Sequence, residues 1–187
     1  MTNDEDYVLQ GQLIDKIKEL YRLKHVVRFN TRNVIKKETV AEHTFNVAMI
    51  CVLLLEQYGI TNEKIRLDCI TKALMHDLPE IDYNDITYDV KNLLNLRPVL
   101  KEYEDKYFVE KYPCQAKLMH DYIPVVDDIV NYADALSVYQ YISNEIVLGN
   151  KSEDITAILS DMPQRLHKCK KELEASIMEV TKNGSLA

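Results

Sequence analysis

Residues 39–58, TVAEHTFNVAMICVLLLEQY, decide the fold. Their apolar positions recur at steps of three and four residues, which is the period of one face of an α-helix. Thr39 followed three residues later by Glu42 is the capping-box pattern of a helix N-terminus. Gly59 is a typical stop just beyond a helix C-terminus. The stretch therefore predicts a long helix over about 40–58.

The rest of the chain also favours helices over strands. Only four Gly and five Pro occur in 187 residues, so few turns are available. Further helices are predicted over about 7–24, from after a cap at Thr61 to Leu78-Pro79, and over 101–111, 124–148 and 152–182, where Pro163 would interrupt the last. Residues 26–39 are expected to form a loop, and 79–96 a turn-rich segment that becomes weakly helical. Without a repeat or a linker, this pattern predicts one all-α domain.

Composition excludes several classes of protein. Hydrophobic residues make up 47% and charged residues 28%, as in ordinary globular proteins. The formal net charge of -7 would repel a nucleic-acid backbone. The start, MTNDEDYVLQ, does not resemble a signal peptide, and no apolar run could span a membrane, so we expect a cytoplasmic protein. The four cysteines lie far apart without a CxxC pair and are expected to be reduced core thiols: Cys51, Cys69, Cys114 and Cys169.

His43 lies on the apolar stripe of the 40–58 helix. It precedes three core candidates by four, seven and eleven residues, namely Val47, Ile50 and Leu54. Its imidazole should therefore face the core, where a histidine is either a hydrogen-bonded packing residue or a ligand. The next helix shifts the balance towards a ligand, because it ends with the doublet His76-Asp77. A buried carboxylate at that position requires a cation or several donors to offset its desolvation.

Asp134 supplies a second carboxylate in the 124–148 helix. Taken alone, it is either a surface residue or an inward-facing one, four residues after Val130. Together, two imidazoles and two carboxylates from three helices form a mixed nitrogen and oxygen set that suits a divalent ion and leaves positions for water and substrate. Such an ion can acidify water and polarise a phosphoryl oxygen. The set therefore predicts hydrolysis of a phosphate ester.

This ordered set, in a helical chain, resembles the HD-domain metal-dependent phosphohydrolases. The resemblance is closer to the bacterial HD-domain 5'-deoxynucleotidase family and runs from about 27 to 150. It is carried by Arg28 with its aromatic neighbour, TVAEHT at 39–44 with Val47-Ala48, His76-Asp77-x-x-Glu80, and the pattern ADAL-x2-Y-x5-E-x3-GN at 133–150. It implies a helical bundle forming a single HD domain over 1–187, in which 151–187 is a C-terminal extension packed on the rest.

The resemblance also implies a role for each matching residue. The metal ligands would be His43, His76, Asp77 and Asp134. Glu80 matches the family's acid that binds or orients the attacking water, provided that the helix continues past Pro79. Asp85 matches a carboxylate that acts near the leaving oxygen. Arg28 would donate to the substrate phosphate through its planar fork. Without the family, Glu80, Asp85 and Arg28 would be read as ordinary surface residues.

Phe29 departs from the family, which has a tryptophan there that packs on the sugar and helps to exclude a 2'-hydroxyl. Phenylalanine still presents an apolar wall to a deoxyribose. The resemblance further implies one divalent ion, which could be Co, Mn, Zn, Fe or Mg, and a homodimer. Neither the metal nor the base of the nucleotide can be read from the sequence.

The leading hypothesis is removal of the 5'-phosphate from deoxyribonucleoside 5'-monophosphates. The first alternative is a triphosphohydrolase of the phage type, which cleaves deoxynucleoside triphosphates with the same four ligands. The second is a ligand-sensing HD module without turnover, and the third is a helical scaffold. The third leaves the two helix-buried carboxylates without a partner.

Overall fold

A computed structural model describes residues 3–182, with side chains placed from residue 11 onward. Apart from an isolated antiparallel bridge between Val27 and Thr39, the regular structure in this range is helical. The elements are α1 (Asn3–Tyr21), η1 (Arg22–His25), α2 (Val40–Gln57), α3 (Glu63–Met75), α4 (Glu80–Tyr83), α5 (Tyr88–Leu93), α6 (Arg97–Lys111), α7 (Pro113–His120), α8 (Pro124–Val147) and α9 (Glu153–Lys182). The prediction of an all-α fold is confirmed.

The N-terminus of α2 has the predicted capping box. Thr39 Oγ1 accepts from the Glu42 backbone N–H at 3.2 Å, and Glu42 Oε2 accepts from the Thr39 backbone N–H at 2.8 Å. These two hydrogen bonds satisfy donors that a helix start leaves unpaired. The helix ends as predicted before Gly59, whose φ of 64° is a conformation that glycine adopts without strain.

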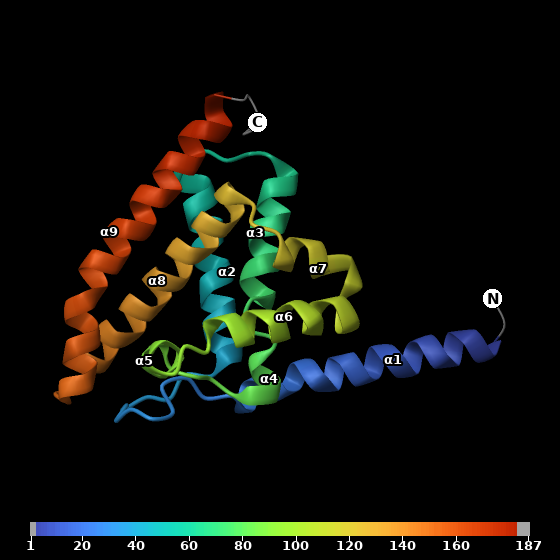
Figure 1. Cartoon of the computed structure of the whole chain (residues 1–187), viewed down its shortest axis with the longest axis horizontal. Coiled ribbons are helices and arrows are strands. Elements are labelled where there is room, and N and C mark those ends of the chain that lie inside the picture. Colours follow the sequence, from blue (N-terminus) through green and yellow to red (C-terminus); the bar gives the residue numbers. More distant parts are fainter. Residues whose placement is uncertain (1–2, 183–187) are drawn as a thin grey trace.

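Three helices enclose the largest part of the core (Figure 1). α2 packs against α3 and α8, and α9 runs along the outer side of α8. The main buried cluster draws on all four of these helices and includes Leu55, Cys69, Ile129 and Leu173. α6 and α7 pack across one side, while α1 projects from the body of the molecule (Figure 1).

The structure differs from the local predictions at five places. The cap of α3 is Asn62 rather than Thr61, since its side chain accepts from the Ile65 backbone N–H at 3.1 Å. α3 ends at Met75, earlier than expected, and α6 begins at Arg97, earlier than 101, because a proline in its first turn suits a helix start. α7 was not predicted. α9 passes through Pro163 without interruption, because its packing on α8 outweighs one lost backbone hydrogen bond.

The cysteines are free thiols, as predicted, but they are not all in the core. Cys51 and Cys69 are buried, Cys169 is partly buried and Cys114 is exposed at the start of α7. Separately, no helix within residues 3–182 combines the length and apolar character that crossing a membrane requires.

Candidate metal and phosphate site

The four predicted ligands come together where α2, α3 and α8 meet. His43 lies in the first turn of α2, His76 is the C-cap of α3, Asp77 follows it, and Asp134 lies in the middle of α8. Donor atoms of His43, His76 and Asp77 lie within 4.8 Å of one another. His43 Nε2 is 3.1 Å from Asp134 Oδ1 and 3.7 Å from Asp77 Oδ2, and His76 Nε2 is 3.3 Å from Asp77 Oδ2. Three distant segments thus bring two imidazoles and two carboxylates together.

Both imidazoles are oriented so that Nε2 faces this cluster. Nδ1 of His76 lies 2.8 Å from the Ala73 carbonyl oxygen, and Nδ1 of His43 lies 3.2 Å from Ser137 Oγ. A carbonyl oxygen only accepts, so His76 Nδ1 carries the proton and Nε2 presents its lone pair. Both Nε2 atoms are buried without a hydrogen-bond partner. Ligating histidines commonly have this arrangement, so the residues present fit a divalent metal ion.

The electrostatics of the cluster favour metal-binding protonation states. Burial and the nearby Arg28 guanidinium lower the pKa of His43, which keeps its imidazole neutral at neutral pH. Burial acts to raise the pKa of Asp77, but His76, His43 and Arg28 lower it overall. The pKa of Asp134 is likewise lowered overall, since His43 and two arginines outweigh burial. Neutral imidazoles and ionised carboxylates are the forms that coordinate metal.

Arg28 and Phe29 belong to the loop between η1 and α2. The Arg28 side chain is 11% exposed, and its Nη1 donates to Glu38 Oε2 at 2.9 Å. The negative charges of Asp134 and Asp77 outweigh burial and raise the Arg28 pKa, so this guanidinium lies within the field of the metal-site carboxylates. Phe29 adopts a positive φ of 53° and stacks on the ring of Tyr141 at 5.1 Å between centroids. The predicted phosphate and sugar contacts are therefore neighbours of the cluster.

Asp85 is brought to this loop rather than left in solvent. Its Oδ2 accepts from the Phe29 backbone N–H at 2.9 Å, and its carbonyl oxygen accepts from the Asn30 side chain at 3.3 Å. Asp85 thus holds the unusual backbone conformation at Phe29 in place. A contact with a leaving group stays a prediction.

Glu80 is buried beside the cluster. The helical path resumes after Pro79, so Glu80 is the first residue of α4, with 3% of its surface exposed. Burial and the negative charge of Asp77 raise its pKa well above the usual value for a glutamate. Lys91 Nζ lies 3.4 Å from Glu80 Oε1, while Glu80 Oε2 is buried without a partner. Lys91 was missed by the sequence analysis, since it lies in α5, which a loop separates from the α4 helix of Glu80, so helical spacing does not relate the two residues.

The end of the ADAL pattern holds the loop that contains Arg28. Glu145 is 1% exposed, and its carboxylate accepts from the backbone N–H groups of Ile35 and Lys36 at 2.6 and 2.8 Å. The Asn150 side chain donates to Glu145 at 2.8 Å and to the Asn33 carbonyl oxygen at 2.7 Å. Glu145 of α8 and Asn150 just beyond it therefore tie the loop of residues 26–39 to the helix that carries Asp134.

Two further residues of the site were not singled out in the sequence. Ser137 lies three residues after Asp134, on the same face of α8, and that spacing could have revealed it. Arg165 of α9 donates from Nη2 to Asp134 Oδ2 at 2.6 Å. It lies 31 residues from its partner, so only the docking of α9 on α8 reveals it.

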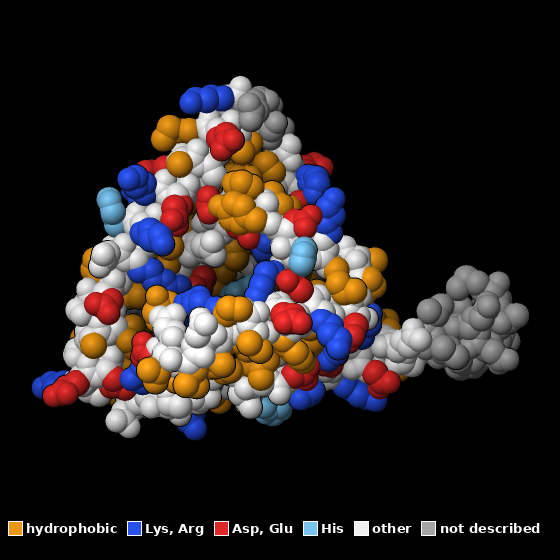
Figure 2. All heavy atoms as spheres, viewed as in Figure 1, with side chains coloured by type: hydrophobic (Ala, Val, Ile, Leu, Met, Phe, Trp, Pro, Cys, Tyr) orange, Lys and Arg blue, Asp and Glu red, His pale blue; other side chains and the backbone are white. Residues whose placement is uncertain are grey.

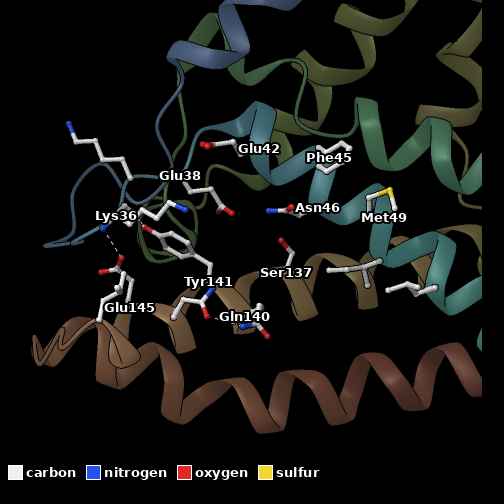
Figure 3. A pocket seen from close by; sticks show the side chains of 15 residues that line it. Lys36, Glu38, Glu42, Phe45, Asn46, Met49, Ser137, Gln140, Tyr141 and Glu145 are labelled. Carbon is white, nitrogen blue, oxygen red and sulfur yellow. Dashed lines mark hydrogen bonds between the residues drawn. The ribbon is translucent and has the colours of Figure 1, made fainter.

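A groove of about 540 Å³ runs between α2 and α8 beside the cluster (Figure 3). Glu38 and Tyr141 lie at its loop end, and Ser137 and Asn46 face one another across it. None of the four predicted ligands lines this groove. It meets the metal cluster from behind, through the contact of Ser137 with His43. Its lining residues Glu38 and Tyr141 also contact Arg28 and Phe29, respectively. A separate hollow opens in the middle of the face in Figure 2, to the right of α8 and above α6, with Lys and Arg side chains along its edge.

Known proteins resemble this chain in sequence and in fold. Residues 20–112 match the sequence model of the HD domain. A dATP triphosphohydrolase of Acinetobacter phage SH-Ab 15497 is 33% identical over 87 residues, 42% of this chain and 42% of that protein. The chain thus spans less than half of that relative.

Solved structures share the fold over nearly the whole chain. An HD phosphohydrolase of cyanophage S-2L, bound to dA and one catalytic Zn²⁺ ion, aligns over 89% of this chain and 96% of its own with a TM-score of 0.69 at 17% identity. A conserved hypothetical protein of Pyrococcus furiosus aligns over 90% of this chain and 99% of its own with a TM-score of 0.70 at 25% identity.

Residues 20–112, about half of the chain, match the HD domain, and solved HD phosphohydrolases share the fold of nearly the whole chain. The superfamily resemblance is confirmed. The closer resemblance to bacterial 5'-deoxynucleotidases stays a prediction.

Proposed function

We propose that this protein is a metal-dependent phosphohydrolase that removes the 5'-phosphate from deoxyribonucleoside 5'-monophosphates. The observation that carries the proposal is the convergence of two buried, unpartnered Nε2 atoms with two ionised carboxylates. The proposed ligands of one divalent ion are His43, His76, Asp77 and Asp134. A bound divalent ion supplies an acidified water and polarises phosphoryl oxygens.

The residues around the ligands have roles that their positions support. Arg28, held by Glu38, donates to phosphoryl oxygens from the loop side. Glu80 orients the attacking water and accepts its proton, for which its raised pKa and its unpartnered Oε2 are suited. Asp85 lies beside Phe29 and would deliver a proton to the departing 5'-oxygen. A leaving alkoxide requires such a proton.

The sugar would pack against Phe29. Its ring is supported from behind by Tyr141, whose hydroxyl donates to the Lys36 carbonyl oxygen at 2.7 Å. This stacked pair gives a rigid apolar wall that favours a deoxyribose over a ribose. The base is left open.

The phage dATP triphosphohydrolase and the dA-bound cyanophage structure support a second candidate, hydrolysis of a deoxynucleoside triphosphate to the nucleoside and triphosphate. The two candidates predict different products. Purified protein loaded with Mn²⁺, Co²⁺ or Zn²⁺ should be given dAMP and dATP, and the products separated by ion exchange. Release of inorganic phosphate from dAMP supports the monophosphatase. Release of triphosphate from dATP, with no phosphate released from dAMP, would refute the monophosphatase and support the triphosphohydrolase.

A homodimer remains part of the proposal. Exposed apolar side chains follow one face of α2, where Phe45 and Leu53 are each 60% exposed, and Leu148 at the end of α8 is 53% exposed. Light scattering after gel filtration measures the mass directly. A monomeric mass at micromolar concentration would refute the dimer.

A further inference from the structure

Arg165 is a charged residue of α9 that reaches the candidate metal site. Its Nη2 donates to Asp134 Oδ2 at 2.6 Å, while the other oxygen of this carboxylate, Oδ1, lies 3.1 Å from His43 Nε2. One oxygen of the Asp134 carboxylate therefore faces the imidazole of His43, and the other faces the Arg165 guanidinium. Arg165 lies outside residues 20–112, which match the HD domain, and outside the ADAL pattern.

The two arginines beside the ligands differ in how their charge is balanced. Arg28 is 11% exposed and pairs at 2.9 Å with Glu38, which is not one of the proposed ligands. Arg165 is 42% exposed, and its partner Asp134 is a proposed ligand. A carboxylate that serves as a metal ligand shares its charge with the ion, so the guanidinium paired with it can attract a further anion. The partial exposure of Arg165 leaves it open to a ligand arriving from solvent.

We propose that Arg165 is a second phosphate-binding arginine, so that the phosphoryl group of the substrate is held between Arg165 on the α9 side and Arg28 on the loop side. The inference rests on the proposed function. The bond to Asp134 uses Nη2, and the planar fork of arginine carries further N–H donors matched to phosphate oxygens. Arg28 belongs to the loop between η1 and α2, and Arg165 belongs to α9, so the two donors come from separate elements, as in a clamp.

Phosphate titration tests this directly. Inorganic phosphate should be titrated by calorimetry into Mn²⁺-loaded wild-type, Arg165→Ala, Arg165→Lys and Lys168→Ala proteins. Lys168 is a matched control, because it lies one turn further along α9 and its side chain is 75% exposed. Loss of charge-assisted hydrogen bonds should weaken phosphate binding roughly 10- to 100-fold in Arg165→Ala, with a smaller loss in Arg165→Lys. Binding by Lys168→Ala should stay within about twofold of wild type.

Two further readouts separate a phosphate contact from a structural role. The Mn²⁺ affinity of Arg165→Ala should stay within about threefold of wild type, and its KM for dAMP should rise more than its kcat falls. Unchanged phosphate affinity in Arg165→Ala would overturn the inference, as would an equal loss in Lys168→Ala. A joint loss of Mn²⁺ and phosphate binding would make Arg165 a residue that positions Asp134, which also overturns it. If wild-type protein bound phosphate but released none from dAMP, the proposed function would fail while this test would still stand.

Discussion

Replacing Glu145 with Gln should loosen the loop of residues 26–39, which contains Arg28 and Phe29, without changing metal binding. Oε2 of Glu145 accepts two hydrogen bonds, from Ile35 N and Asn150 Nδ2, and Oε1 accepts one from Lys36 N. A glutamine that keeps its oxygen at the Oε2 position leaves only the Lys36 N–H without an acceptor. An unsatisfied buried donor costs about 1–3 kcal/mol, and partial solvent access at Lys36 favours the lower half of that range. For a chain of this length, about 1–2 kcal/mol corresponds to a fall in Tm of roughly 2–8 °C.

The same substitution should impair the site through the loop. Arg28 and Phe29 lie in the segment that Glu145 ties down, so kcat/KM for dAMP should fall by about tenfold through misplacement of these residues. The assay pairs thermal unfolding with steady-state phosphate release and a Mn²⁺ titration. Asn144→Ala, a change of the exposed neighbour on α8, is the control and should alter stability by less than about 0.5 kcal/mol.

The dependence on pH sharpens this prediction. Burial would raise the pKa of Glu145, but hydrogen bonds from Asn150, Ile35 and Lys36 lower it overall. Its stabilisation should therefore be complete above the unfolded-state pKa of about 4.3 and be lost as pH falls through the lower folded-state pKa. The difference in stability between wild type and Glu145→Gln should shrink in that acidic range. An unchanged Tm and kcat/KM, or a selective loss of Mn²⁺ binding, would refute the anchoring role.

Three other substitutions test residues that stabilise the helices around the site or contact the phosphate. Lys72→Met should destabilise the protein by about 2 kcal/mol in urea, because it leaves the partly buried carboxylate of Asp127, whose Oδ1 lies 2.7 Å from Lys72 Nζ, without its cation. A loss below about 0.5 kcal/mol would contradict this. Thr39→Ala should cost about 1 kcal/mol by removing the α2 cap, and Thr39→Ser should restore it. The gap between Thr39→Ala and wild type should narrow as pH falls below about 4.3, since hydrogen bonds with Thr39 lower the pKa of Glu42. Arg28→Lys should raise KM for dAMP by about tenfold while Mn²⁺ affinity is kept; equal kinetics would remove Arg28 from the phosphate site.

The sequence was sufficient to predict the parts of the molecule that obey local rules. The apolar period that contains His43 and the capping box at Thr39 fix both the helix and the inward direction of the imidazole. Local rules failed where two residues offer the same chemistry, as at Thr61 and Asn62, which are adjacent candidates for one cap. They also failed at Pro163, where tertiary packing overrides a local penalty.

Contacts between distant segments could not be predicted in the same way. Glu145 stood out as part of a pattern, but the two backbone N–H groups from which it accepts lie about 110 residues away in a loop without periodicity. Arg165 and Lys91 carry no spacing signal relative to Asp134 and Glu80, so their contacts appear only when the helices are assembled. The donor set was accessible from the sequence because each member lies on or at the end of a helix, whereas the groups around it come from loops and a distant helix.

The central claim is that His43, His76, Asp77 and Asp134 hold one divalent ion that is needed for phosphate release. The most direct test is a calorimetric titration of Mn²⁺ into chelator-treated wild-type and His76→Ala/Asp77→Ala proteins, with phosphate release from dAMP followed in the same samples. The account predicts one ion bound per wild-type chain, recovery of phosphate release with that binding, and neither in the double variant. Mn²⁺ binding and turnover at wild-type levels in the double variant would contradict it.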